Sequence, residues 1–135
     1  MFQFQIRNSQ SAHSFLKDRF SVDQEEFWVL ALGSELQVLD CKMLFRGTVH
    51  SCPVHPRDVI RFVAGANATS FMIAHNHPEG QALPSRSDLA VTRQLWKVGG
   101  LIEIPLTDHL ILGKEGYCSL ADRGFFLKMS LKGAV

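Results

Sequence analysis

Two histidines separated by a single residue, His75 and His77, have the type and spacing that suit metal binding. Residues 69–74 precede them, and this largely apolar run predicts a buried strand. Because side chains alternate along a strand, both imidazoles project to one side and Asn76 faces the other. Asp88 follows His77 after ten intervening residues. We predict that His75, His77 and Asp88 bind one divalent ion.

The chemistry of these three side chains favours zinc over the hard alkaline-earth ions. Two neutral imidazoles and one carboxylate suit Zn²⁺, whereas Mg²⁺ and Ca²⁺ prefer oxygen ligands. Three protein ligands leave a fourth position open, which is typical of catalytic rather than structural zinc sites. Water in that position becomes a nucleophile near neutral pH. The pattern therefore predicts a hydrolytic zinc centre.

A simpler interpretation exists for each of these residues taken singly. A lone histidine is more often an ordinary surface or core residue than a ligand, and Ser85 with Asp88 matches the capping box of a helix that begins there. The capping and metal-binding interpretations are compatible, because a carboxylate in the first helical turn can do both. The combined spacing carries the prediction, not any one residue.

Two carboxylates, Glu25 and Glu26, stand directly before the apolar residues 27–32. A metal-bound water needs a nearby base that takes its proton and later passes it to the leaving amine. Adjacent side chains in a strand face opposite sides, so the two glutamates are not interchangeable. The residues alone leave both as alternatives, together with the simpler interpretation of solvated charges at a strand end.

The stretch from His75 to Asp88 resembles the JAMM (MPN-type) metallopeptidase signature, which is His-x-His, ten residues and Asp with an internal Ser-x-x-Asp. More narrowly it resembles the RadC-like branch, whose usual wording is HNHPSG followed by PS..D. This chain has HNHPEG and then PSRSD, so Glu79 replaces the customary serine at a position that is not a ligand in the family pattern. The resemblance extends from about residue 24 to residue 124.

This resemblance implies roles for individual residues. It implies zinc held by His75, His77 and Asp88, and its Gln-Glu-x-Phe setting places the general base on Glu25 rather than Glu26. Cleavage of peptide or isopeptide bonds is also implied by the family. The hydroxyl of Ser85, where the helix cap leaves it free, is suited to donate a hydrogen bond to a tetrahedral oxyanion.

Another pair, Asp108 and His109, resembles the Asp-His that precedes the last long strand in the family. Two interpretations stay open for this pair. One is that it orients a metal ligand, and the other is that it is a hydrogen-bonded pair at the start of a strand.

Size and composition indicate one globular domain. The chain has 135 residues with 46% hydrophobic and 20% charged side chains, enough for a proper core. A formal net charge of +1 gives no electrostatic support for nucleic-acid binding. No apolar run approaches the roughly 18 residues of a membrane span, and the N-terminus does not match a secretory signal. Three cysteines without C-x-x-C spacing favour free thiols in the cytoplasm.

The pattern of elements predicts a single mixed-sheet α/β domain flanked by helices. The resemblance implies a cytidine-deaminase-like, JAMM-type architecture with a lead-in at 1–23, the domain at 24–124 and a tail at 125–135. It also implies that so short a chain lacks the upstream helix-hairpin-helix region of longer members. We expect helices at 11–19, 55–63 and 88–98, the first capped by Ser9 or Ser11 and the last ended by Gly99-Gly100. We expect extended segments at 24–32, 36–45, 46–49, 69–74, 101–106, 109–113 and 117–120.

Three function classes follow from these observations. The predicted class is a zinc-dependent hydrolase, a metallopeptidase or isopeptidase acting on a peptide or protein substrate. The alternatives are a metal-dependent nuclease or DNA repair factor and a non-catalytic MPN-type interaction module. Non-catalytic relatives usually lose ligands, so the retained histidines and carboxylates favour chemistry. Substrate identity and oligomeric state are left open by the sequence.

Overall fold

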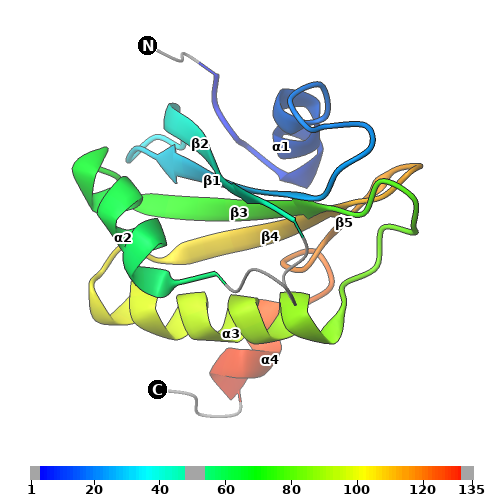
Figure 1. Cartoon of the computed structure of the whole chain (residues 1–135). Coiled ribbons are helices and arrows are strands. Elements are labelled where there is room, and N and C mark those ends of the chain that lie inside the picture. Colours follow the sequence, from blue (N-terminus) through cyan, green and yellow to red (C-terminus); the bar gives the residue numbers. More distant parts are fainter. Residues whose placement is uncertain (1–3, 48–53, 132–135) are drawn as a thin grey trace.

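The computed structural model describes residues 4–47 and 54–131 (Figure 1). The elements are four helices and five strands among these residues, in the chain order α1 (Ser9–Leu16), β1 (Glu26–Leu32), β2 (Val38–Arg46), α2 (Pro56–Gly65), β3 (Ser70–Asn76), α3 (Arg86–Leu101), β4 (Leu106–Leu112), β5 (Tyr117–Ser119) and α4 (Phe125–Leu131).

The five strands form one mixed sheet in the order β2-β1-β3-β4-β5. β1 pairs antiparallel with β2 and with β3, and β4 pairs antiparallel with β5. β3 and β4 are parallel, and α3 makes the crossover that a parallel pair requires. In the β1–β3 register Phe27 lies opposite His75, so the start of β1 lies beside the end of β3. This pairing brings the two glutamates to the predicted histidines.

Helices cover both faces of the sheet, as Figure 1 shows, with α1 on one side and α2 and α3 on the other. Leu16 of α1 packs with Leu30 and Met72 in one core cluster. Val59 of α2 and Leu95 of α3 pack in a second cluster with the opposite face of the sheet. These three helices each bury apolar residues against one sheet face, and the prediction of a single mixed α/β domain is confirmed.

The first helix begins earlier than the sequence pattern suggested. α1 spans Ser9–Leu16 and its N-cap is Asn8, so the predicted range of 11–19 and the predicted serine caps were wrong. Asn8 Oδ1 accepts the Ser11 backbone N–H at 2.8 Å, and Ser11 Oγ accepts the Asn8 N–H at 3.1 Å. An asparagine caps a helix as well as a serine does, and the two residues together make the capping box.

The prediction that Gly99 and Gly100 end α3 was wrong, because the helix continues to Leu101. A Cβ atom on Gly99 would lie 2.6 Å from the Ile104 carbonyl oxygen and 3.2 Å from the Phe71 ring. Gly99 therefore permits close approach between the end of α3 and the chain that enters β4. Its role is packing, which periodicity along one helix does not reveal.

The C-terminal third has two further differences from the predicted pattern. The extended runs expected at 101–106 and 109–113 are one strand, β4, which begins only at Leu106. Asp108 lies buried inside it because Ser119 Oγ, at 2.6 Å, and the backbone N–H groups of His109 and Ala121 satisfy its carboxylate. Residues beyond 124, expected to form a tail, include the helix α4.

The other elements lie close to the predicted ranges, including the β1–β2 hairpin, α2, β3 and β5. The extended segment predicted at 46–49 reaches beyond the described residues after Gly47. Cys41 and Cys118 are free thiols, and Cys52 lies outside the described residues. Within the described part of the chain, no helix combines the length and apolar character needed to cross a bilayer.

Candidate metal centre

His75 lies near the end of β3, with only 2% of its side chain exposed. Its Nδ1 atom is 2.8 Å from Asp88 Oδ1. An ionised carboxylate only accepts hydrogen bonds, so Nδ1 donates to Asp88, and in the neutral imidazole this leaves the lone pair on Nε2. Nε2 is buried, has no hydrogen-bond partner among the described residues, and lies 3.3 Å from Glu25 Oε1. It is an available metal donor.

His77 follows β3 by one residue and completes the imidazole pair. Its ring lies at 90° to the His75 ring, with 5.1 Å between the centroids. His77 Nε2 is 3.2 Å from Asp88 Oδ2. The hydrogen bond to Asp88 raises the pKa of His77 against the opposing effect of burial. The neighbouring Asp88 carboxylate therefore favours a positive charge at the His77 ring.

Asp88 lies in the first turn of α3 with its side chain fully buried. Burial alone would raise the pKa of Asp88, but hydrogen bonds from His75 and His77 outweigh it and hold the pKa well below its usual range. Asp88 Oδ2 also accepts the Ser85 backbone N–H at 2.8 Å, and Ser85 Oγ accepts the Asp88 N–H at 3.0 Å. The predicted capping box is confirmed, and it places this carboxylate against the two histidines.

Three donor atoms, one each from Glu25, His75 and His77, all lie within 4.8 Å of one another. Zinc bonds of about 2.0–2.2 Å place neighbouring tetrahedral donors roughly 3.3–3.6 Å apart, and the 3.3 Å between Glu25 Oε1 and His75 Nε2 matches. Asp88 is not a member of this set and instead contacts both imidazoles. The structure thus brings all four predicted groups to one place, while Asp88 as the third ligand stays a prediction.

The residues at this centre fit a divalent ion on two grounds. The unpartnered Nε2 of His75 is a buried polar atom, and such atoms normally have a partner. The donor set of imidazoles and carboxylates matches the preference of zinc.

The two adjacent glutamates have different environments. Glu26 is buried, and its oxygens accept hydrogen bonds from the Ser21 N–H at 3.0 Å, the Trp28 indole at 3.1 Å and the Arg46 guanidinium at 2.7 Å. Burial raises the pKa of Glu26, but the Ser21 and Arg46 contacts outweigh it and lower the pKa overall. Glu25 instead points toward His75 and is 29% exposed. Glu26 is thus occupied by structural contacts.

Asn76, for which the sequence pattern predicted no role, makes three hydrogen bonds to the segment that carries Glu25. Its Oδ1 accepts the Glu26 N–H at 2.6 Å, and its Nδ2 donates to the carbonyl oxygens of Ser21 and Gln24 at 3.1 and 3.0 Å. The signal in the sequence was an amide in an otherwise apolar strand, where a buried polar group requires partners.

Thr92, also missed from the sequence, joins His109 to the turn that carries Asp88. Its hydroxyl donates to the Asp88 carbonyl oxygen at 2.6 Å and lies 2.7 Å from His109 Nδ1. Burial lowers the pKa of His109 to about 3, so this imidazole is neutral. The interpretation of Asp108 and His109 as a hydrogen-bonded pair near the start of a strand is confirmed, because Asp108 Oδ1 accepts the His109 backbone N–H at 2.7 Å. The His109 ring in addition contacts Thr92 of α3.

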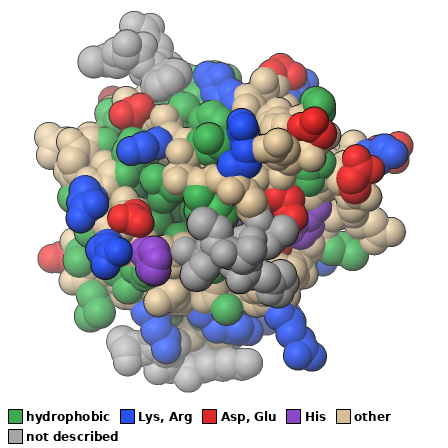
Figure 2. All heavy atoms as spheres, in the orientation of Figure 1, with side chains coloured by type: hydrophobic (Ala, Val, Ile, Leu, Met, Phe, Trp, Pro, Cys, Tyr) green, Lys and Arg blue, Asp and Glu red, His purple; other side chains and the backbone are tan. Residues whose placement is uncertain are grey.

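A surface pocket of about 400 Å³ opens beside the centre and is lined by Gln24, Glu25, Arg46 and Gly47. Figure 2 shows acidic and histidine side chains reaching the surface together near the end of β3, beside the grey atoms. Lys, Arg, Asp and Glu side chains are interspersed over this face (Figure 2). Glu25 thus lines a surface pocket as well as facing His75.

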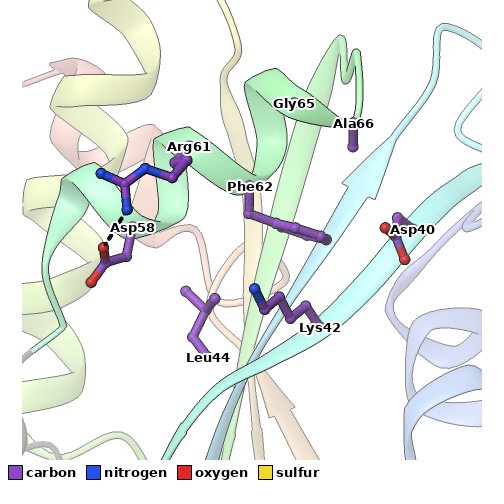
Figure 3. A pocket seen from close by; sticks show the side chains of 8 residues that line it. All are labelled: Asp40, Lys42, Leu44, Asp58, Arg61, Phe62, Gly65 and Ala66. Atoms are coloured by element: carbon purple, nitrogen blue, oxygen red, sulfur yellow. Dashed lines mark ion pairs between the residues drawn. The ribbon is translucent and has the colours of Figure 1, made fainter.

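A second pocket, of about 430 Å³, lies between α2 and β2, and the metal centre contributes no residue to it. Figure 3 shows Phe62 of α2 and Leu44 and Lys42 of β2 lining it. Arg61 pairs with Asp58 at 3.6 Å on its rim. Among the described residues that line it there is no histidine or cysteine, so they do not match the ligand set of the His75–Asp88 motif.

Three curated proteins that are similar to this chain are each described as a UPF0758 protein. YsxA of Bacillus subtilis is 39% identical over 123 residues, which are 90% of this chain and 53% of the relative. A protein of Alcanivorax borkumensis is 43% identical over 100 residues, 74% of this chain and 45% of the relative. One of Listeria monocytogenes is 42% identical over 103 residues, 76% and 46% respectively. The chain spans about half the length of these curated relatives.

A family model described as "RadC-like JAB domain" matches residues 6–125, which include α1 and every strand of the sheet. The matched region contains all the residues of the metal centre. The resemblance inferred from His75, His77 and Asp88 is thereby confirmed. The chain belongs to the RadC-like JAB domain family.

Proposed function

We propose that this domain is a zinc-dependent hydrolase that uses a metal-activated water to cleave an amide bond. The bond is either a peptide bond or an isopeptide bond to an amino-acid side chain. The observation that carries the proposal is the buried Nε2 of His75, which has no hydrogen-bond partner among the residues described, faces the Glu25 carboxylate and lies close to His77. Membership of the JAB family supports metal-dependent hydrolysis in general.

Three residues would hold the ion in this proposal. His75 and His77 supply imidazole nitrogens and Asp88 supplies the carboxylate that already contacts both rings. A bound zinc ion supplies Lewis acidity, which polarises the scissile carbonyl and lowers the pKa of water. The capping box keeps the Asp88 side chain beside both imidazoles before any ion binds. Ligation would replace its contact with His75 Nδ1, because Nδ1 and Nε2 point to opposite edges of the ring.

Glu25 is the proposed general base. It takes a proton from the attacking water and returns it to the leaving amine. Its carboxylate lies beside the imidazoles and also lines the surface pocket with Arg46, where an extended substrate can enter. Glu26 is engaged by Ser21, Trp28 and Arg46, which supports the choice of Glu25.

Ser85 is the proposed hydrogen-bond donor to the developing oxyanion. Its oxygen accepts the Asp88 backbone N–H in the capping box. A hydroxyl that accepts through its oxygen keeps its own proton for donation. Helix capping and oxyanion stabilisation are therefore compatible in one side chain.

The test begins with elemental analysis of the purified chain and of His75→Ala. We expect close to one zinc per wild-type chain and much less in the variant. Wild-type protein should then hydrolyse members of a peptide and isopeptide panel, while Glu25→Gln, of equal size, should lower kcat by about 10²- to 10⁴-fold.

Two results would contradict the proposal. Zinc retained with DNA cleaved and all peptides untouched would identify a nuclease. Absence of specific metal binding by the wild-type chain would identify a non-catalytic module on the same fold.

A further inference from the structure

The carboxamide of Asn76 lies between the two metal-binding histidines but faces the opposite side of β3. Its side chain is buried, with the residue 4% exposed. All three of its hydrogen bonds run to one segment, residues 21–26, which precedes and enters β1. One short stretch of β3 therefore presents imidazoles on one face and holds the glutamate segment from the other.

The held segment also has hydrogen bonds of its own: Ser21 Oγ accepts the N–H groups of Asp23 and Gln24, and the Gly47 N–H donates to the Glu25 carbonyl oxygen at 2.8 Å. Residues 21–25 form bends without helix or strand, so no regular ladder fixes their backbone. Glu26 Oε1 accepts the Ser21 N–H at 3.0 Å and closes the segment into a loop. The Asn76 amide lies within that loop, bonding to both of its ends and to the Gln24 carbonyl. Glu25 is the residue after Gln24 and belongs to the same loop.

Asparagine suits this position because the loop presents one donor and two acceptors. The carboxamide oxygen meets the Glu26 N–H, and the two N–H groups meet the two carbonyl oxygens. Aspartate has the same shape but offers no donors when ionised, and serine is shorter with a single donor. The match is therefore specific to the amide group.

We propose that Asn76 is a positioning residue, whose carboxamide ties the 21–26 loop to β3 and thereby sets the Glu25 carboxylate against His75 and His77. This inference rests on the proposed function of Glu25 as the base. The stretch from His75 to His77, at the end of β3, thus carries both imidazoles and also holds the loop. A displacement of about 1 Å in a reacting group costs on the order of 100-fold in rate.

The activity test compares Asn76→Ala with Met72→Ala. Met72 is buried on the same strand and the same sheet face but lies at the other end of β3. Asn76→Ala should lower kcat by about 100-fold with KM and zinc content little changed, whereas Met72→Ala should keep kcat. Asn76→Asp is the second variant if the alanine chain does not fold.

A double-variant cycle separates positioning from a general structural role. In the Glu25→Gln background, Asn76→Ala should cause no further loss of kcat, because Asn76 acts through Glu25. A further loss of the full size in that background would overturn the proposal. So would an unchanged kcat in the single variant.

Hydrogen exchange supplies a readout that needs neither metal nor substrate. The Glu26 amide should exchange at least roughly tenfold faster in Asn76→Ala than in the wild type, and unchanged in Met72→Ala. Unaltered exchange at this amide would overturn the proposal. If wild-type protein cleaves no amide bond, the proposed function fails on its own, and this measurement still decides whether Asn76 holds the loop.

Discussion

The Asp88 carboxylate holds the His75 imidazole by a contact of 2.8 Å between Oδ1 and Nδ1, and so turns the Nε2 atom of that ring toward Glu25. A carboxylate that accepts from one ring nitrogen fixes the tautomer and the orientation of the other. Asp88 also contacts His77. Two carboxylates thus flank the imidazole pair, and each has a distinct predicted role.

Asp88→Asn and Glu25→Gln should separate these roles, because each exchange keeps size and removes charge. We expect Asp88→Asn to weaken zinc binding at least 10- to 100-fold and Glu25→Gln to bind zinc nearly as wild type. Competition titration against a zinc chelator measures both. The reverse pattern would make Glu25 the third ligand and would limit Asp88 to its contacts with the two imidazoles.

Ser85 has two roles whose losses are measured separately. Ser85→Ala should lower the free energy of unfolding by about 1 kcal/mol, because the Asp88 N–H loses its cap. It should also lower kcat by about 100-fold if the hydroxyl meets the oxyanion. Ser85→Thr keeps the hydroxyl and should recover most of both. A loss of stability alone would limit Ser85 to capping.

The buried His109 should make the stability of the metal-free domain depend on pH. Its folded-state pKa is lowered to about 3 by burial, from 6.5 in the unfolded chain. Between these values the unfolded chain binds more protons, so its contribution is full above pH 6.5 and is lost progressively as the pH falls toward 3.

The measurement is urea unfolding from pH 7 to pH 4 of the wild type and of His109→Gln, which keeps a donor for Thr92. As the pH falls, the free energy of unfolding should decrease more steeply for the wild type than for His109→Gln. The two slopes should differ by up to about 1.4 kcal/mol per pH unit. Parallel curves for the two proteins would show that His109 does not titrate in this way.

Adjacent glycines at the end of α3 should respond oppositely to alanine. Gly99→Ala should destabilise the domain by about 1–3 kcal/mol, because the new Cβ would lie 2.6 Å from the Ile104 carbonyl oxygen. At Gly100 no described atom lies within 4 Å of a built Cβ, so Gly100→Ala should stabilise by roughly 0.5–1 kcal/mol. Thermal unfolding of both variants checks the contrast, and equal effects would contradict it.

Local patterns in the sequence were sufficient for much of the fold and for the family. The His75-x-His77 spacing, its distance to Asp88 and the cap at Ser85 are short-range features, and the strand and helix periodicities around them depend on neighbouring residues. The exact start of α1 and the end of α3 were wrong because a cap residue and a packing glycine have alternatives that only the folded surroundings distinguish.

Tertiary structure decided how the centre is assembled. The β1–β3 register, with Phe27 opposite His75, selects Glu25 to face the imidazoles and leaves Glu26 to Ser21, Trp28 and Arg46. A register is a relation between residues far apart in the chain, and a shift of one position would exchange the two side chains. The contacts of Asn76 and Thr92 are of the same kind. Residue types and spacing therefore specified which groups are available for chemistry, while strand pairing determined which of them meet.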